Sequence, residues 1–292
     1  MKIIGKIIGI NTSDNLFNLT VVDELENIYN LKTSVNNYNV GNVYCFNVEE
    51  IKGERVSYKI INYSTIEELN FKEADQIFRN FMPSAPLPLE KAMTIIDSYI
   101  NHIDSNIIKE ITSNLLSEYT PKYFTYPAAS RLHHAYVGGL AYHCVGMLRM
   151  ADAFIENYSY LNKDYLYAGI ILHDLGKIQE LTGIQNTEYS LDGQLLGHLV
   201  IGALEISKMA TKLGYDETEE VKILKHLLIS HHGQPQFGAA KRPMTPEAIA
   251  LWYIDTIDSK FRVLGEELVK TESGKFTESI GVLDKIKVYK SK

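Results

Sequence analysis

The first part of the chain alternates apolar and polar positions in short runs, which is the pattern of half-buried strands. Turn-forming residues such as Asn36-Asn37 and Lys52-Gly53-Glu54 separate these runs. The alternation predicts five strands, at residues 6–10, 16–22, 28–33, 43–48 and 56–62. Five short strands in a segment of this size predict a small closed β-barrel over residues 1–65.

A barrel of five short strands fits the OB fold, whose members bind single strands by stacking bases on aromatic rings. The predicted strands offer five candidate rings, Phe17, Tyr29, Tyr44, Phe46 and Tyr58. Aromatic residues are favoured in strands in any case, and about half of them must face the core. The pattern therefore leaves base stacking and core packing open for these side chains.

The pattern changes after the barrel. Residues 67–81 predict a short helix, and the run Met82-Pro83-Ser84-Ala85-Pro86-Leu87-Pro88 cannot continue it. From Leu89 onward, apolar residues recur at steps of three and four, which is the period of a helix. Beyond residue 115, helices are predicted over 135–158, 164–179, 193–213, 217–231 and 245–267. We therefore expect a linker at 66–88 and an all-α domain at 89–292.

Composition narrows the class of protein. The formal net charge of -7 argues against a protein that coats nucleic acid by bulk charge. Two cysteines, Cys45 and Cys144, exclude a disulfide framework and a cysteine-rich zinc site. The chain has no apolar run long enough to span a bilayer, and its start lacks the features of a signal peptide. We expect a cytoplasmic protein without a membrane partner.

The sequence that points to chemistry is Ile170-Ile171-Leu172-His173-Asp174-Leu175-Gly176-Lys177. Its apolar start places His173 and Asp174 at the edge of a buried core, where a carboxylate without a partner is costly. A metal ion would satisfy the imidazole and the carboxylate together. Gly176 is expected to let the chain turn and so to aim Lys177 at the metal or a bound phosphate. The alternatives are a core His–Asp pair and a solvated lysine.

Most of the other histidines lie in or beside separate predicted helices. They are His133, His134, His143, His198, His231 and His232. The last predicted helix adds Asp255 and Asp258, three residues apart and so on nearly the same face. Helices packed as a bundle can bring such residues to a common centre.

This order of His, His-Asp, His, His and Asp resembles the HD superfamily of metal-dependent phosphohydrolases. The resemblance implies that His143, His173, Asp174 and Asp255 hold one divalent metal ion. Asp255 fits the apolar register of the motif better than Asp258, which we expect to support a ligand or to lie at the surface.

The resemblance also implies a second metal ion, held by His198 and His231 and bridged to the first by Asp174. His232 is an additional candidate ligand, because the tandem histidines leave the register open by one residue. Imidazole and carboxylate ligands suit several transition metals, and the spacing does not choose among them.

A narrower resemblance lies in the segments 133–140, 172–177 and 230–233, which are similar to the YhaM-type 3′–5′ exoribonucleases. Those proteins also carry an OB-type domain ahead of the HD domain. The similarity implies hydrolysis of single-stranded RNA, with single-stranded DNA as a second candidate, to 5′-mononucleotides. It favours Mn²⁺ as the metal.

In that mechanism two ions would lower the pKa of a water molecule between them and neutralise the phosphate. Asp174 would orient the metals, and Lys177 with His134 would stabilise the charge that develops on the phosphate. His133 and Arg131 are further candidates for substrate contact. For His133 and His134, capping of the following helix is the alternative.

Two other functions are open. A phosphohydrolase or phosphodiesterase for free or cyclic nucleotides would keep the same site and change the substrate. A nucleic-acid-binding protein with a purely structural metal is the third hypothesis, and the full set of ligands argues against it. A homo-oligomer is compatible with the sequence, which offers no specific argument for one.

Overall fold

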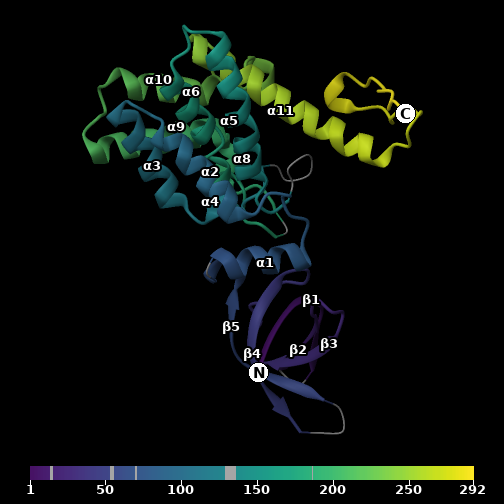
Figure 1. Cartoon of the computed structure of the whole chain (residues 1–292). Helices are drawn as coiled ribbons and strands as arrows, with labels where there is room; N and C mark the ends of the chain where they lie inside the picture. Colours follow the sequence, from purple (N-terminus) through teal and green to yellow (C-terminus); the bar gives the residue numbers. More distant parts are fainter. Residues whose placement is uncertain (14–15, 53–55, 70, 129–135, 186) are drawn as a thin grey trace.

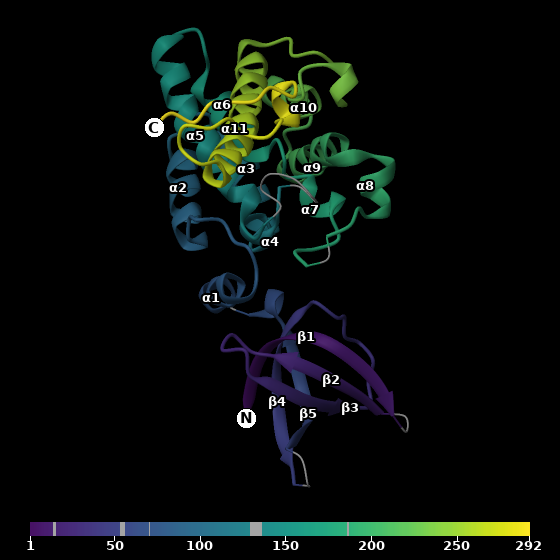
Figure 2. The same cartoon turned by 90° about the vertical axis from the view of Figure 1, so that its right-hand side faces the viewer.

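A computed structural model of the chain describes residues 1–13, 16–52, 56–69, 71–128, 136–185 and 187–292. A β-barrel lies at one end of the molecule and a helical domain at the other, with helix α1 between them (Figures 1 and 2). Within the described residues, no helix combines the length and apolar character that crossing a membrane requires.

The barrel closes in the order β1-β2-β3-β5-β4. Its strands are β1 (Lys2–Ser13), β2 (Leu16–Val22), β3 (Ile28–Thr33), β4 (Val43–Ile51) and β5 (Ser57–Thr65). β1 is long enough to pair with β4 through its first half and with β2 through its second half. β3 and β5 pair in parallel, and the other neighbours pair antiparallel. The predicted OB-like barrel is confirmed.

The aromatic rings of the barrel divide between its core and its surface. Phe46 and Tyr44 are buried in the barrel core, so the hypothesis of base stacking is wrong for these two. Phe17, Tyr29 and Tyr58 are partly exposed, and the rings of Tyr29 and Tyr58 lie 6.0 Å apart. The alternation of a strand places successive side chains on opposite faces, and here two of the five rings are buried while three remain partly exposed.

The segment after the barrel packs against both domains. It forms a short 3₁₀ helix, η1 (Ile66–Glu68), and α1 (Phe71–Phe81). Ile77 and Phe78 of α1 are buried in the core of the helical domain. Val43 and Cys45 of β4 belong to the same core. The start of β4 is therefore joined to the helical domain by apolar contacts.

The helical domain surrounds α6, which is almost entirely buried. Its helices are α2 (Leu89–Asn101), α3 (Asn106–Tyr119), α4 (Lys122–Thr125), α5 (Gly139–Asn157), α6 (Lys163–Leu172), α7 (Lys177–Glu180), α8 (Leu191–Leu195), α9 (Gly197–Leu213), α10 (Glu219–Ser230) and α11 (Pro246–Lys270). Side-chain caps begin several of them: Asn162 starts α6, Ser190 starts α8 and Thr245 starts α11.

Two predicted helices are interrupted in the structure. The helix expected over 164–179 stops after Leu172 and resumes as α7. The helix expected over 193–213 is divided into α8 and α9 by Gly197, whose φ of 72° lies in the left-handed region. Both interruptions place residues of the candidate site at the end or start of a helix.

The all-α domain expected up to residue 292 ends earlier, at Lys270. Residues 271–292 fold back on themselves through isolated bridges between Phe276 and Tyr289 and between Ile280 and Ile286. They include a short 3₁₀ helix, η3 (Gly281–Leu283). In Figure 1 the second half of α11 and this segment extend away from the body of the domain.

Candidate metal centre

Five helices bring the candidate side chains together at the centre of the domain. His143 lies on α5, the pair His173-Asp174 directly follows α6, and His198 is in the first turn of α9. The tandem histidines follow α10, and Asp255 lies on α11. Five of these side chains are buried: His143, His173, Asp174, His198 and His231.

Asp174 is at the middle of the cluster, and its two oxygens face different partners. Oδ2 lies 3.3 Å from Nε2 of His173 and accepts a hydrogen bond of 2.7 Å from Nζ of Lys177. Oδ1 lies 3.4 Å from Nε2 of His198 and 3.8 Å from Nε2 of His231. A single carboxylate therefore connects two groups of histidines.

Two of the imidazoles are held by backbone carbonyls of their own helices. Nδ1 of His173 lies 2.7 Å from the carbonyl oxygen of Ile170, and Nδ1 of His231 lies 2.7 Å from that of Leu228. In each case the partner is three residues earlier. A carbonyl only accepts, so Nδ1 carries the proton and the lone pair of Nε2 points into the cluster.

Two other imidazoles are held by carboxylates. Nδ1 of His143 lies 2.8 Å from Oδ2 of Asp258, while its Nε2 lies 3.1 Å from Oδ1 of Asp255. Nδ1 of His198 lies 3.0 Å from Oε1 of Glu180. Asp255 is therefore on the inner side of His143, and Asp258 is behind it.

A cavity of about 160 Å³ opens onto the cluster. It is lined by Ala128, His143, Asp174, Lys177, His231, His232, Asp255 and Ser259. The ammonium group of Lys177 thus lies at the wall of the cavity and beside Asp174, not in solvent. The cavity offers room for small groups next to the inward-facing imidazole and carboxylate atoms.

Several inward-facing atoms are buried without a hydrogen-bond partner among the described residues. They are Nε2 of His173, His198 and His231 and Oδ1 of Asp174. A buried polar atom without a partner is costly, and a divalent cation would satisfy these atoms together. Imidazole and carboxylate donors are the ligands that such cations take in proteins. The cluster is compatible with divalent metal binding.

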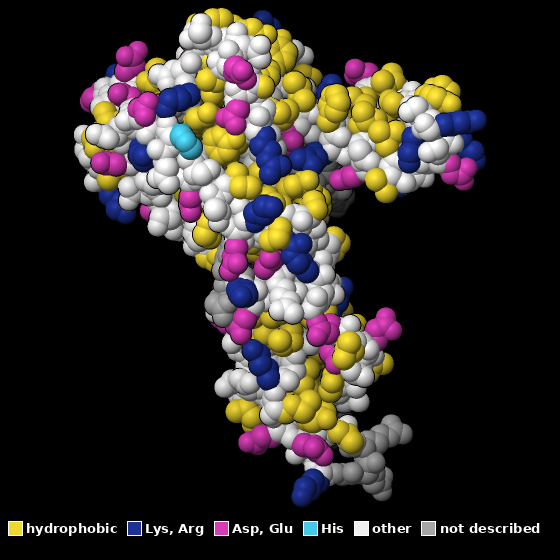
Figure 3. Space-filling view, in the orientation of Figure 1, with side chains coloured by type: hydrophobic (Ala, Val, Ile, Leu, Met, Phe, Trp, Pro, Cys, Tyr) yellow, Lys and Arg dark blue, Asp and Glu magenta, His cyan; other side chains and the backbone are white. Residues whose placement is uncertain are grey.

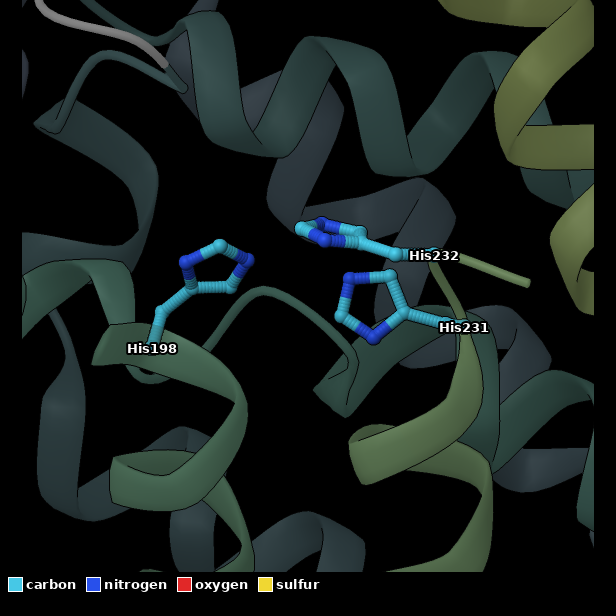
Figure 4. A group of neighbouring side chains, drawn as sticks. All are labelled: His198, His231 and His232. Atoms are coloured by element: carbon cyan, nitrogen blue, oxygen red, sulfur yellow. The ribbon is translucent and has the colours of Figure 1, made fainter. Parts of the chain in front are cut away.

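The donor atoms form two groups, each within 4.8 Å. One group comprises His143, His173 and Asp174, and the other comprises His198, His231 and His232. Figure 4 shows the second group, with the ring of His198 facing the rings of the tandem histidines across a shared space. His232 is the more exposed of the tandem pair, and its Nδ1 lies 2.8 Å from the carbonyl oxygen of Phe237.

The electrostatics of the site keep its carboxylates ionised. Burial raises the pKa of Asp174, but interactions with Lys177 and His173 outweigh burial and hold this pKa well below its usual range. Burial and His143 act in the same opposed way on Asp255, whose pKa is also lowered. Both side chains are therefore anionic at neutral pH, as carboxylate ligands of a metal ion must be.

The histidines respond differently to burial. Burial lowers the pKa of His231 well below its usual range, so this imidazole is neutral and its lone pair is available. At His143 burial also lowers the pKa, but hydrogen bonds to Asp255 and Asp258 outweigh it and raise the pKa to about 9. Without a metal, the imidazole of His143 is therefore protonated on both nitrogens and positively charged at neutral pH.

Three residues expected near the substrate, Arg131, His133 and His134, lie outside the described residues. Their roles stay predictions. The segment that contains them precedes α5, which carries His143.

The prediction that Gly176 provides a special turn of the chain is wrong. Its φ of -59° is ordinary for a helix, so it provides no special turn. A Cβ at this position would instead collide with the carbonyl oxygen of His198 and approach the amide nitrogen of Gly202 to 2.9 Å. Gly176 therefore allows the segment that holds Asp174 and Lys177 to pack against the backbone of α9.

Glu180 and Ser259 belong to the site but were not predicted from the sequence. Glu180 is buried and lies between two apolar residues, Ile178 and Leu181, one turn after Lys177. Its neighbours include the polar Lys177, Gln179 and Thr182, so the sequence around it gives no signal of burial. Ser259 lies one helical turn after Asp255, and its hydroxyl oxygen lies 3.2 Å from Oδ1 of that residue.

The sequence of the chain is similar to known proteins over most of its length. Residues 140–260 match the HD domain family. A protein of Bacillus licheniformis named 3′–5′ exoribonuclease YhaM is 43% identical over 211 residues, which are 72% of this chain and 67% of that protein. The chain belongs to the YhaM family. A Geobacillus protein of the same name is 45% identical over 211 residues, 72% of this chain and 65% of its own length.

The Bacillus subtilis YhaM protein is 40% identical over 236 residues, 81% of this chain and 74% of its own length. The match thus spans about two thirds of the length of these YhaM relatives or somewhat more. No solved structure matches the chain. All the donor atoms of the two groups described above lie inside the HD segment of this YhaM-family chain.

Proposed function

We propose that the chain is a metal-dependent 3′–5′ exoribonuclease that hydrolyses single-stranded RNA to 5′-mononucleotides. The observation that carries the proposal is the set of buried imidazole and carboxylate atoms that lack hydrogen-bond partners among the described residues, beside a cavity that Asp174 and His231 line. Membership of the YhaM family supports the substrate, since the relatives are named as 3′–5′ exoribonucleases.

We assign one ion to the side of the cluster that contains His143, His173 and Asp255. Asp174 completes this set, because its Oδ2 lies 3.3 Å from Nε2 of His173. Bound divalent ions, with Mn²⁺ favoured, would supply Lewis acidity that lowers the pKa of a coordinated water and offsets phosphate charge. Asp255 would contribute from the wall of the cavity.

We assign a second ion to the other side of Asp174. Its Oδ1 lies toward His198 and His231, and the buried Nε2 atoms of both histidines are without hydrogen-bond partners among the described residues. His232 faces the same space and is the third donor of this group. Asp174 would then bridge the two ions.

Lys177 has a role that does not require coordination. Burial lowers the pKa of its ammonium group, but Asp174 outweighs burial and the pKa is raised, so the group stays charged. It lines the cavity and lies where it can donate to a phosphate oxygen. In the substrate complex Lys177 would stabilise the charge that develops on that oxygen.

The barrel offers a groove for the single strand. A groove of about 640 Å³ is lined by residues that include Lys32, Lys59, Tyr38 and Tyr63. Lys32 and Lys59 are directly paired between β3 and β5, and like charges in paired positions repel each other unless an anion lies between them. Tyr38 is buried in the barrel core, so the groove combines two cations for phosphates with one half-buried aromatic ring, Tyr63, for a base.

The rest of the surface does not favour nucleic acid by bulk charge. On the face shown in Figure 3, Lys and Arg side chains alternate with Asp and Glu side chains from the barrel to the helical domain. This agrees with the formal net charge of -7. RNA contact would thus depend on local features such as the barrel groove and the metal centre.

The test is digestion of a 5′-labelled single-stranded RNA by chelator-treated protein, with and without Mn²⁺. We expect a ladder that shortens from the 3′ end only with metal, and no ladder from the Asp174→Asn variant. Single-stranded DNA serves as the second substrate. Hydrolysis of free or cyclic nucleotides without cleavage of either polymer would instead support the phosphodiesterase alternative.

A further inference from the structure

Four histidines of the candidate centre direct Nε2 inward, but the partners of their Nδ1 atoms differ in charge. His173 and His231 donate to neutral backbone carbonyls. His143 and His198 donate to carboxylates. These two histidines belong to different donor groups, so each group contains one imidazole with an anionic partner.

The partner of His143 is a buried carboxylate that the surrounding residues hold in place. Asp258 is 6% exposed, and its Oδ1 lies 3.5 Å from Nε of Arg262. Arg262 is itself fixed by Tyr142, to whose hydroxyl it donates at 2.6 Å and over whose ring it lies at 4.2 Å. Gly146 provides the space for the Asp258 carboxylate, since a Cβ at this position would collide with Oδ1 of Asp258.

The partner of His198 is held in a comparable way. Oε1 of Glu180 accepts hydrogen bonds of 3.0 Å from both Nδ1 and the backbone nitrogen of His198. The backbone of Glu180 is packed tightly, because a Cβ at Gly193 would collide with its carbonyl oxygen. The backbone nitrogen of Ser190 donates to the same carbonyl oxygen at 2.9 Å.

Both carboxylates lie behind an imidazole, away from the cavity. Neither Asp258 nor Glu180 is among the described residues that line it. They therefore have no position from which to touch a substrate and act only through the histidines. A carboxylate that accepts from Nδ1 fixes the orientation of the ring and makes Nε2 a stronger donor to a metal.

We propose that Asp258 and Glu180 are positioning residues, each serving one half of the metal centre. Asp258 orients the ring of His143 toward the ion that His173 and Asp174 also bind. Glu180 orients the ring of His198 toward the ion that the tandem histidines also bind. The inference rests on the two-ion site of the proposed function. It adds that replacing Asp258 or Glu180 lowers the metal affinity of one ion site and not that of the other.

The experiment measures metal binding directly, without RNA. Full-length protein is stripped with chelator and titrated with Mn²⁺ by calorimetry. The wild type is expected to show two binding steps. Asp258→Asn should weaken one step by roughly 10–100-fold and leave the other within about threefold, because loss of such a partner typically costs that much affinity. Glu180→Gln should weaken the other step.

A matched control is Glu205→Gln, a buried carboxylate on α9 that contacts Tyr119 and Lys208 and not the candidate ligands. It should change neither step. Thermal unfolding of the metal-free proteins shows whether a variant has lost metal affinity or has lost stability of the fold. If Asp258→Asn does not fold, Arg262→Gln removes the outer support of Asp258 and should weaken the same step by a smaller factor.

Three results would overturn the proposal. They are a single step in the wild type, equal weakening of both steps by each variant, and unchanged affinity in variants that are merely less stable. Wild-type protein that binds two Mn²⁺ ions but cleaves no RNA would refute the proposed nuclease and leave this inference standing. The two failures are therefore distinguishable.

Discussion

At the scale of single residues, Gly176 shows how the site depends on close packing. Its backbone is helical, and only the missing Cβ allows the contact with His198 and Gly202. We expect Gly176→Ala to lower the free energy of unfolding by about 1–3 kcal/mol, the usual cost of overpacking. Urea unfolding measures this loss. Gly183→Ala, whose Cβ would meet no atom within 4 Å, should change stability much less.

The proton on His143 makes a second prediction at this scale. Burial lowers its pKa, but Asp255 and Asp258 raise it to about 9, so a metal ion must displace that proton at lower pH. We expect affinity for Mn²⁺ at this side of the centre to rise from pH 7 to about 9 and then to level off. Titration calorimetry across this range would contradict the idea if the affinity stayed constant.

The order of histidines and aspartates, through its resemblance to the HD superfamily, was enough to predict most of the cluster. His143, His173, Asp174 and Asp255 come together as expected from their positions on separate apolar helices. Glu180 was missed because its importance comes from the distance to His198, eighteen residues away, which depends on how α7 packs on α9. Sequence spacing does not contain that distance.

At the scale of elements, hydrophobic periodicity predicted which segments are helices and which are strands. It did not predict where a helix is interrupted. The run from Ile170 to Ile178 is apolar enough for one continuous helix. In the structure, Leu175 and Lys177 instead donate to carbonyls three residues earlier, at Leu172 and Asp174. The packing of Gly176 against α9 favours this tighter turn, and periodicity gives no information about it.

The parallel pairing of β3 and β5 makes a prediction about RNA. Replacing Lys32 and Lys59 together by alanine should weaken binding of single-stranded RNA and reduce its salt dependence by about 1–2 phosphate contacts. Filter binding at several salt concentrations measures both. The control replaces Lys208 and Lys212, two exposed lysines of α9. Equal loss in both double variants would exclude a specific role for the groove.

At the scale of the whole molecule, the order of a barrel and then a helical domain followed from the change in hydrophobic period. The junction between them did not. Val43 and Cys45 lie on a strand, yet their side chains belong to the core of the helical domain. In the first four residues of β4 both faces are buried, so the alternation of the strand does not show there which side faces solvent.

A polar contact also connects the barrel with the loop after α7. The backbone nitrogen of Val43 donates to Oε1 of Gln185 at 2.7 Å, and Gln185 lies in the loop after α7. We expect Gln185→Ala to loosen the barrel and to slow digestion of long RNA several-fold. Hydrolysis of a small phosphodiester should be unchanged. Gln194→Ala, an exposed position on α8, is the control, and equal effects on both substrates would count against the idea.

The spread of the cluster along the chain has a consequence for the synthesis of the protein. The candidate ligands lie between His143 on α5 and Asp255 on α11, so the cluster is incomplete until α11 has left the ribosome and packed against α5 and α6. A nascent chain that ends between His232 and the start of α11 contains every histidine of the cluster but lacks Asp255. Chains that end before α11 are therefore expected to be inert, so an incomplete chain would not degrade the messenger RNA from which it is being translated.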